Sequence, residues 1–302
     1  MGVKKKIRCM DFNDEWSTRF VNQVVPKECP YCHENAYDKY GTTKSGYQRF
    51  QCRSCHRTFT LLTGTIFENS HITVFHWMKF VNIAIREMSQ GVSKIGALFL
   101  NLPYWSNVLF RLLAVYSHGI RFSKLVWLDD FRIPIDIGDG RGVIDHACIG
   151  MAIGDPDRIL YKFEGFGRLS QRKSFEAFES VVAENTQLIH SWQNCELHKK
   201  LVEKLNLKCK MISPEKLFEE GEENGFLNFR NCAESFVIGN LPIFQKNPEA
   251  CLDMLTFLIN EDDRTSSELK AVSKLTAIAL DRTQYSFSLK PSALIEEVFP
   301  KS

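Results

Sequence analysis

Four cysteines near the start of the chain have the type and the spacing of a metal site. Cys29 and Cys32 form one Cys-x2-Cys pair, Cys52 and Cys55 form a second, and nineteen residues separate the pairs. Each pair makes a turn that places two sulfurs on one edge of a tetrahedron, so two pairs complete a four-thiolate site for Zn²⁺. Because protein sulfurs fill all four positions, the spacing predicts a structural zinc ion rather than a catalytic one.

The other cysteines and the neighbouring histidines are weaker signals. The basic start of the chain is not followed by the apolar run of a secretory signal, so we expect a reducing, cytoplasmic location. In a reducing compartment, Cys-x-x-Cys pairs indicate metal binding or redox chemistry. A redox site needs only one such pair, so two pairs favour a zinc site. His33 and His56 each follow a ligand cysteine and are alternative ligands. The unpaired cysteines are expected to be small buried hydrophobic side chains: Cys9, Cys148, Cys195, Cys209, Cys232 and Cys251.

The segment that positions the four cysteines has few long apolar runs. Residues 47–52 alternate like a strand, and residues 57–60 have the pattern of its hairpin partner. Because a segment this small cannot bury a sufficient apolar core, we expect the bound metal to stabilise its fold. We expect its basic side chains to face outward toward phosphates: Lys39, Lys44, Arg49, Arg53 and Arg57.

Charge is distributed unevenly along the 302 residues. Residues 1–124 hold 17 basic and 8 acidic side chains, whereas residues 125–302 hold 21 basic and 28 acidic ones. A basic front half indicates a polyanionic partner, because Lys and Arg that neutralise phosphates release counterions. Simple solubility patterning is the other explanation. The chain lacks an apolar stretch of about eighteen residues, so no membrane span is expected.

Helical periodicity follows the cysteine pairs. Residues 11–25 predict a short helix that ends before Pro26, and residues 73–88 place apolar side chains on one helical face. Two further helices are predicted, one capped by Ser93 and one capped by Ser106 after a break at Pro103. This is the layout of a helix-turn-helix unit, and a plain three-helix linker explains the spacing equally well.

From Lys124 onward the pattern predicts a mixed sheet. The expected elements are strands at 125–129, 143–153 and 158–163, a helix at 175–182, a strand at 187–192, a helix at 196–205 and a strand at 208–212. Three hairpin-linked strands followed by alternating helix and strand indicate an α/β sheet. After residue 226 the pattern is mostly helical.

This order of features resembles bacterial insertion-sequence transposases that have an N-terminal zinc ribbon and a DDE catalytic domain of RNase H-like fold. The resemblance covers about residues 27–212. Four short sequence segments carry the resemblance: Gly46–Cys55 in the ribbon hairpin, Thr63–Phe67 with Ser70, His71 and Trp77, Val126–Asp130 in the first catalytic strand, and Gly165–Ser170 before the first core helix.

The resemblance implies a multidomain protein of the α+β or α/β class. Its expected parts are a basic segment with a short helix (1–26), a zinc ribbon (27–62), a helix-turn-helix-like domain (63–123), an RNase H-like DDE-type domain (124–260) and a C-terminal helical tail (261–302).

In such enzymes, carboxylates hold two Mg²⁺ or Mn²⁺ ions roughly 3.5–4 Å apart for phosphoryl transfer. The resemblance makes Asp129 the first acid, and apolar neighbours favour an inward placement over a strand-end cap. Ser191 stands where the second acid is expected, and serine cannot supply a charged bridging oxygen. Glu234 is the candidate third acid; an exposed helical glutamate is the other interpretation. The catalytic set therefore looks incomplete.

Three functions remain open on the sequence. The resemblance implies a protein that binds double-stranded DNA, recognises element ends as a homo-oligomer, and cleaves and transfers strands. Ser191 favours a catalytically inactive, domesticated transposase-derived protein that binds or regulates DNA. The third possibility is a zinc ribbon that contacts protein, against which the basic front half counts.

Overall fold

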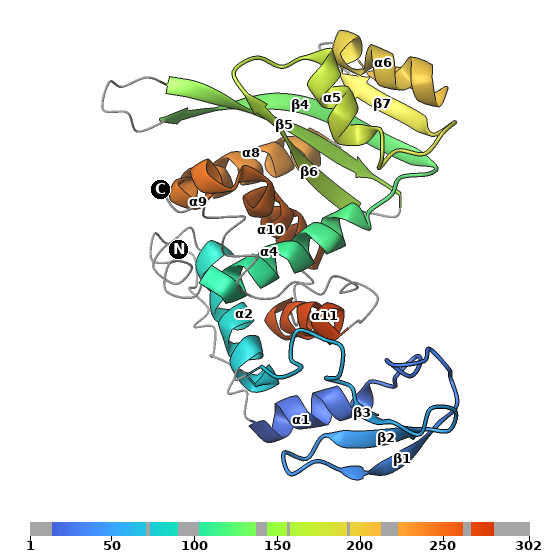
Figure 1. Cartoon of the computed structure of the whole chain (residues 1–302). Helices are drawn as coiled ribbons and strands as arrows, with labels where there is room; N and C mark the ends of the chain where they lie inside the picture. Colours follow the sequence, from blue (N-terminus) through green and yellow to red (C-terminus); the bar gives the residue numbers. More distant parts are fainter. Residues whose placement is uncertain are drawn as a thin grey trace, which may run out of the picture. The chain divides into compact units, whose positions relative to one another are not determined.

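The computed structural model (Figure 1) describes residues 14–70, 73–89, 103–136, 144–155, 158–191, 194–212, 223–261 and 267–280. These residues divide into two compact units. The first contains the described residues up to Ile85 together with residues 267–280, and the second runs from Arg86 to Glu261.

A three-stranded antiparallel sheet surrounds the cysteine pairs in the first unit. Its strands are β1 (Tyr37–Thr42), β2 (Gln48–Cys52) and β3 (Thr58–Thr60), in that order. The two predicted strands of the hairpin are confirmed, and β1 is added. The rings of Tyr37, Phe50 and Phe59 pack together with centroids 5.4 to 5.8 Å apart, which gives this small sheet an aromatic core.

Helix α1 (Asp14–Gln23) packs beside this sheet and confirms the described part of the predicted N-terminal helix. The Asn22 side-chain amide donates to the carbonyl of Gly46 (3.0 Å), and its oxygen accepts from the backbone N–H of Gln48 (2.9 Å). Gly46 has a φ of 81°, a conformation that residues with a Cβ rarely adopt. The turn between β1 and β2 is therefore fixed both by its glycine and by the helix.

The helical segments after the ribbon only partly match the predictions. Helix α2 (Val74–Ser89) confirms the helix expected at 73–88, and its Trp77 is fully buried. The helix expected at Ser93 lies outside the described residues. Helix α4 (Pro103–His118) begins at Pro103 and contains Ser106 rather than being capped by it, because a proline suits the first turn, where its missing N–H costs no hydrogen bond. Most of α2 belongs to the first unit and α4 to the second.

The second unit is built on a five-stranded mixed sheet in the order β6-β5-β4-β7-β8. Its strands are β4 (Leu125–Asp136), β5 (Ile144–Gly154), β6 (Arg158–Phe166), β7 (Gln187–Ser191) and β8 (Lys208–Ile212). The first three form an antiparallel meander, and β7 and β8 run parallel to β4. All five predicted strands are confirmed; β4 is longer than expected because its pairing with β5 continues to Asp136, opposite Ile144.

Helices cover both faces of this sheet (Figure 1). Helices α5 (Gln171–Phe178) and α6 (Cys195–Leu205) lie on one face, and α8 (Glu223–Gly239), α9 (Leu241–Lys246) and α10 (Pro248–Glu261) lie on the other, with α4 packed against α10. The α5/α6 face carries a continuous apolar core that includes Val126, Leu128, Phe175, Phe178, Leu188 and Leu201. This core holds β4 and β7 in register beneath α6.

Two further observations complete the fold. Helix α5 begins four residues earlier than predicted, because the Ser170 hydroxyl accepts a hydrogen bond from the backbone N–H of Lys173 (3.3 Å) and caps the helix. Helix α11 (Ser267–Leu280) belongs to the first unit. None of the described helices combines the length and the apolar character needed to cross a membrane.

Candidate functional sites

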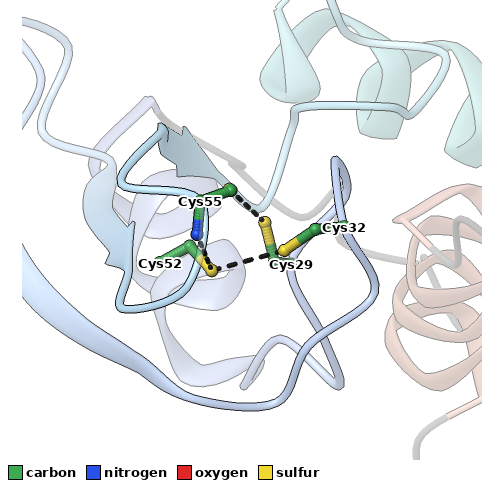
Figure 2. A group of neighbouring side chains, drawn as sticks. All are labelled: Cys29, Cys32, Cys52 and Cys55. Carbon is green, nitrogen blue, oxygen red and sulfur yellow. Dashed lines mark hydrogen bonds between the residues drawn. The ribbon is translucent and has the colours of Figure 1, made fainter.

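The four predicted cysteine ligands come together in the ribbon (Figure 2). Their sulfurs all lie within 4.8 Å of one another. The Sγ atoms of Cys29 and Cys55 are 3.7 Å apart, and those of Cys32 and Cys52 are 3.5 Å apart. A tetrahedral zinc ion with Zn–S bonds of about 2.3 Å requires sulfurs separated by about 3.8 Å. The cluster therefore has the size and the donor set of a four-thiolate zinc site.

The two Cys-x2-Cys turns have the same backbone structure. In each, the N–H of the first cysteine donates to the carbonyl five residues later, and its own carbonyl accepts from the residue four positions on. That fourth residue is His33 in one turn and His56 in the other, with φ values of 61° and 57°. Histidine tolerates this left-handed conformation better than most residues. Neither histidine belongs to the metal-binding group found among the described residues, so their shared feature is the turn they shape.

Local hydrogen bonds also prepare the sulfurs for a cation. Backbone N–H groups of Cys55 and Ser54 lower the pKa of Cys52 to about 6, and the Cys55 N–H lies 3.5 Å from the Cys52 sulfur. The backbone near Glu34 acts in the same direction on Cys32, but burial and the other three sulfurs raise its pKa to about 12. Four thiols crowded this closely cannot all ionise without a cation between them, whereas Zn²⁺ binds cysteine as the thiolate.

The predicted DNA-contacting residues occupy the ribbon surface in different settings. Lys44 is exposed. The Arg49 guanidinium lies 5.6 Å from the ring centroid of Tyr40, and that of Arg57 lies 5.1 Å from the ring centroid of Tyr31. Among the described residues, neither of these two arginines forms an ion pair with an acid. Arg53 forms a two-point ion pair with Asp38, in which Nε is 2.9 Å from Oδ2. Lys39 is exposed.

The second set of polar side chains is in the sheet, where Asp129 and Asp130 occupy the middle of β4. Adjacent residues of a strand point to opposite faces, so the two carboxylates have different surroundings. Both are largely buried, with 9% and 5% of their surface exposed. Asp130 faces α5 and α6, whereas Asp129 faces α8.

Asp130 is held in a buried hydrogen-bond network. The Nε2 atom of His198, on α6, lies 2.5 Å from Asp130 Oδ2, and the hydroxyl of Ser174, on α5, donates to the same carboxylate (3.2 Å). Burial alone would raise the pKa of Asp130, but the hydrogen bond and charge of His198, together with Glu164 and Ser174, outweigh burial and lower that pKa. His190, on β7, lies beside His198 with their Nδ1 atoms 3.4 Å apart. The Asp130 carboxylate is thus fully engaged on this face.

Glu164, on β6, completes the network as a neutral acid. No donor group in the described part of the chain reaches either carboxyl oxygen, and the neighbouring group is the Asp130 carboxylate, an acceptor. Burial and this neighbour raise the pKa of Glu164 to about 10. A protonated Glu164 can donate to Asp130. The contact needs Gly150 on β5, because a Cβ there would lie 2.7 Å from Glu164 Oε1 and 2.6 Å from Phe178 Cζ.

Asp129 lines a pocket of about 320 Å³, together with Asp130, Arg132, Asn194 and Arg230. The Asn194 side-chain amide donates to Asp129 Oδ1 (2.6 Å) and more weakly to the backbone carbonyl of Asp130 (3.3 Å). Arg230, on α8, stacks over the Phe131 ring at 5.0 Å and contributes an attractive charge to Asp129. Burial nevertheless raises the pKa of Asp129 to about 6.

The other two predicted catalytic positions, Ser191 and Glu234, are not among the residues that line the pocket. Ser191 is the last residue of β7, paired with Ile212 of β8. Glu234 is half-buried on α8, one turn beyond Arg230, and Arg230 rather than Glu234 lines the pocket. Sequence reasoning did not identify Asn194 or Arg230. Asn194 could have been found as a helix-capping residue type before α6, whereas nothing local marks Arg230.

Comparisons with known proteins give one partial similarity. The chain is 38% identical over 58 residues to a protein described as an uncharacterized protein in transposable element ISH50, from Halobacterium salinarum. The match covers 19% of this chain and 19% of that protein, so the similarity spans about a fifth of either length. No family model matches the sequence, and no solved structure matches it either. A segment of the chain is therefore similar to a protein of a transposable element.

Proposed function

We propose that the chain is a transposase-like DNA-binding protein with a zinc-stapled ribbon and an RNase H-like second unit. The observation that carries this proposal is the sheet order β6-β5-β4-β7-β8 with Asp129 in the middle of its central strand. An antiparallel meander followed by two parallel strands, each preceded by a helix, is what the resemblance to DDE transposases implies. The similarity to a transposable-element protein supports the same origin.

The ribbon is the proposed DNA-binding part. Residues 27–62 contain six Lys and Arg against three Asp and Glu, and Arg49 and Arg57 lie over exposed tyrosine rings. Arginine binds phosphate through several N–H donors at once, and a zinc ion would hold rigid the cysteine turns next to these arginines. Double-stranded DNA is the proposed partner, bound by a homo-oligomer when two element ends are joined.

The surroundings of Asp129 favour a protein that binds DNA without cutting it by a two-metal mechanism. Two Mg²⁺ ions need several carboxylate oxygens, but Asp129 is approached by the Asn194 amide and the Arg230 charge. In the described residues, the four cysteines are the group that could hold a metal. The competing function is strand cleavage and transfer, with Asp129 and Glu234 as metal-binding acids and a further carboxylate at or near Ser191.

Two measurements test the proposal. Fluorescence anisotropy of a labelled duplex, titrated at several salt concentrations, should give an affinity that falls steeply with salt; an affinity indifferent to salt would contradict phosphate contacts. The same duplex, extended by the terminal repeat of the element, should stay uncut in Mg²⁺ or Mn²⁺. Nicking that disappears in Asp129→Ala would establish cleavage instead.

A further inference from the structure

The pocket beside Asp129 lies where a ligand most readily reaches a sheet of this kind. The parallel pairing of β4 with β7 ends at Leu128 opposite His190, while β4 continues to Asp136. The pocket opens beyond this point, at the carboxyl end of β7 and the N-terminus of α6. Ligands of open α/β sheets bind in such a crevice at the carboxyl ends of strands.

The donor set of the pocket does not fit a pair of divalent cations. Asp129 is the carboxylate that faces it, because Asp130 directs its own carboxylate to His198 and Ser174. Asn194 faces two acceptors, Asp129 Oδ1 and the Asp130 carbonyl, so its amide must present hydrogens rather than its oxygen to them. A cation would also be repelled by Arg230.

The same walls suit an anion. The lining residues include Arg132, Arg230, His146 and Asn194, against the acids Asp129 and Asp130, of which Asp130 is engaged by His198 and Ser174. Helix α6 begins at the pocket, and Asn194, at its cap position, makes no side-chain hydrogen bond to it. The positive end of the helix dipole therefore adds to the two arginine charges.

We propose that this pocket binds a backbone phosphate of DNA directly through Arg230 and Arg132, with no divalent cation. The inference rests on the proposed DNA-binding function and names a second contact site for the same partner. Guanidinium groups replace the metal ions of the catalytic family as the phosphate-neutralising charges. Arg230 is pre-positioned by its stacking on Phe131, which reduces the side-chain freedom it loses on binding.

The test is duplex affinity of the full, zinc-loaded chain in EDTA and in Mg²⁺, measured by fluorescence anisotropy at fixed salt. Arg230→Gln and Arg132→Gln should each weaken binding about tenfold, the effect of one lost charge-assisted contact. Asp129→Asn should tighten binding by about two- to fivefold, since it removes a negative charge beside the phosphate. Arg172→Gln is the matched control, because Arg172 is exposed and paired with Glu176 on α5.

The possible results distinguish phosphate binding in the pocket from DNA binding by the chain as a whole. Tighter binding by Asp129→Asn and weaker binding by both arginine variants, equal in EDTA and Mg²⁺, would support the pocket. Affinity that rises with Mg²⁺ and loses this rise in Asp129→Asn would overturn it in favour of a metal site. Wild-type binding that no pocket variant changes would overturn the pocket alone. Absence of any duplex binding by the wild type would overturn the proposed function.

Discussion

The cysteine cluster and the Asp129 pocket both gather polar side chains, but they gather opposite kinds. In the ribbon, four side chains of one type converge on a common centre, with sulfurs 3.7 Å apart in the pair Cys29–Cys55 and 3.5 Å apart in the pair Cys32–Cys52. In the pocket, one carboxylate is met by an amide and by a guanidinium. The first set lacks charge compensation without a cation, whereas the second is already compensated by protein groups.

The two sites therefore differ in how they tolerate the substitution of a single residue. A four-cysteine cluster fails if one ligand changes, because the remaining sulfurs no longer close the tetrahedron. A buried carboxylate pocket tolerates replacement of its partners as long as hydrogen bonds and charges still balance. Asn194 and Arg230 are such a balanced set around Asp129.

The largest effect should follow from breaking the cluster. In Cys52→Ser, the ribbon loses the zinc-binding free energy on which its fold depends, about 10 kcal/mol or more for structural zinc. Zinc content, measured by atomic emission, should fall by one equivalent per chain, and amide protection should be lost in residues 27–62. Cys232→Ser, at an exposed position of α8, is the control and should keep both. Full zinc content in Cys52→Ser would contradict the four-thiolate site.

The Asp130 network should respond next, and without any metal. His198→Ala removes the closest partner of a buried carboxylate and should lower the free energy of unfolding by about 3–5 kcal/mol, measured by urea denaturation of the second unit. The exposed His118→Ala is the control and should change it little. If the two variants were equally stable, the 2.5 Å contact between His198 and Asp130 would not be what stabilises β4.

Glu164 should make the stability of the second unit depend on pH. The folded chain holds a proton on Glu164 that the unfolded chain releases, because folding raises its pKa from 4.5 to about 10. Stability of the wild type should therefore fall as pH rises through this window, by at most about 1.4 kcal/mol per pH unit. Glu164→Gln lacks this proton, so its stability relative to the wild type should increase with pH.

Urea denaturation at a series of pH values would measure this trend, with Glu176→Gln, an exposed glutamate on α5, as the matched control. A difference between Glu164→Gln and the wild type that does not vary with pH would mean that Glu164 is ionised in the folded protein. In that case a bound cation, and not a proton, would have to balance the two carboxylates.

The smallest effect should appear among the arginines of the ribbon. Arg57→Gln should weaken duplex binding several-fold and reduce the salt dependence by about one counterion, since Arg57 lies over the Tyr31 ring and forms no ion pair with an acid in the described part of the chain. Arg53→Gln should weaken binding less, because Asp38 already offsets the Arg53 charge. Anisotropy titrations at several salt concentrations compare the two, and an equal loss would show that the Asp38 pair opens on DNA.

Much of the fold could be predicted because its signals are local. The strand patterns predicted at 47–52, 125–129 and 208–212 are confirmed, with β4 longer than predicted, and the helices predicted at 73–88 and 196–205 are confirmed as α2 and α6. Errors concentrated at helix starts, where single capping contacts decide: Pro103 rather than Ser106 begins α4, and Ser170 moves the start of α5. Strand β1 was missed because its sequence does not alternate in polarity.

The sequence by itself determined the cysteine cluster, because two short turns of fixed spacing build nearly the whole site and only their approach is long-range. It also determined that Asp129 lies on a buried strand. Only the tertiary structure decided what meets that carboxylate: Asn194 lies 65 residues away along the chain and Arg230 about a hundred. Whether a buried carboxylate binds a metal, a proton or a guanidinium depends on which side chains the packing of α6 and α8 delivers, and no local pattern records that.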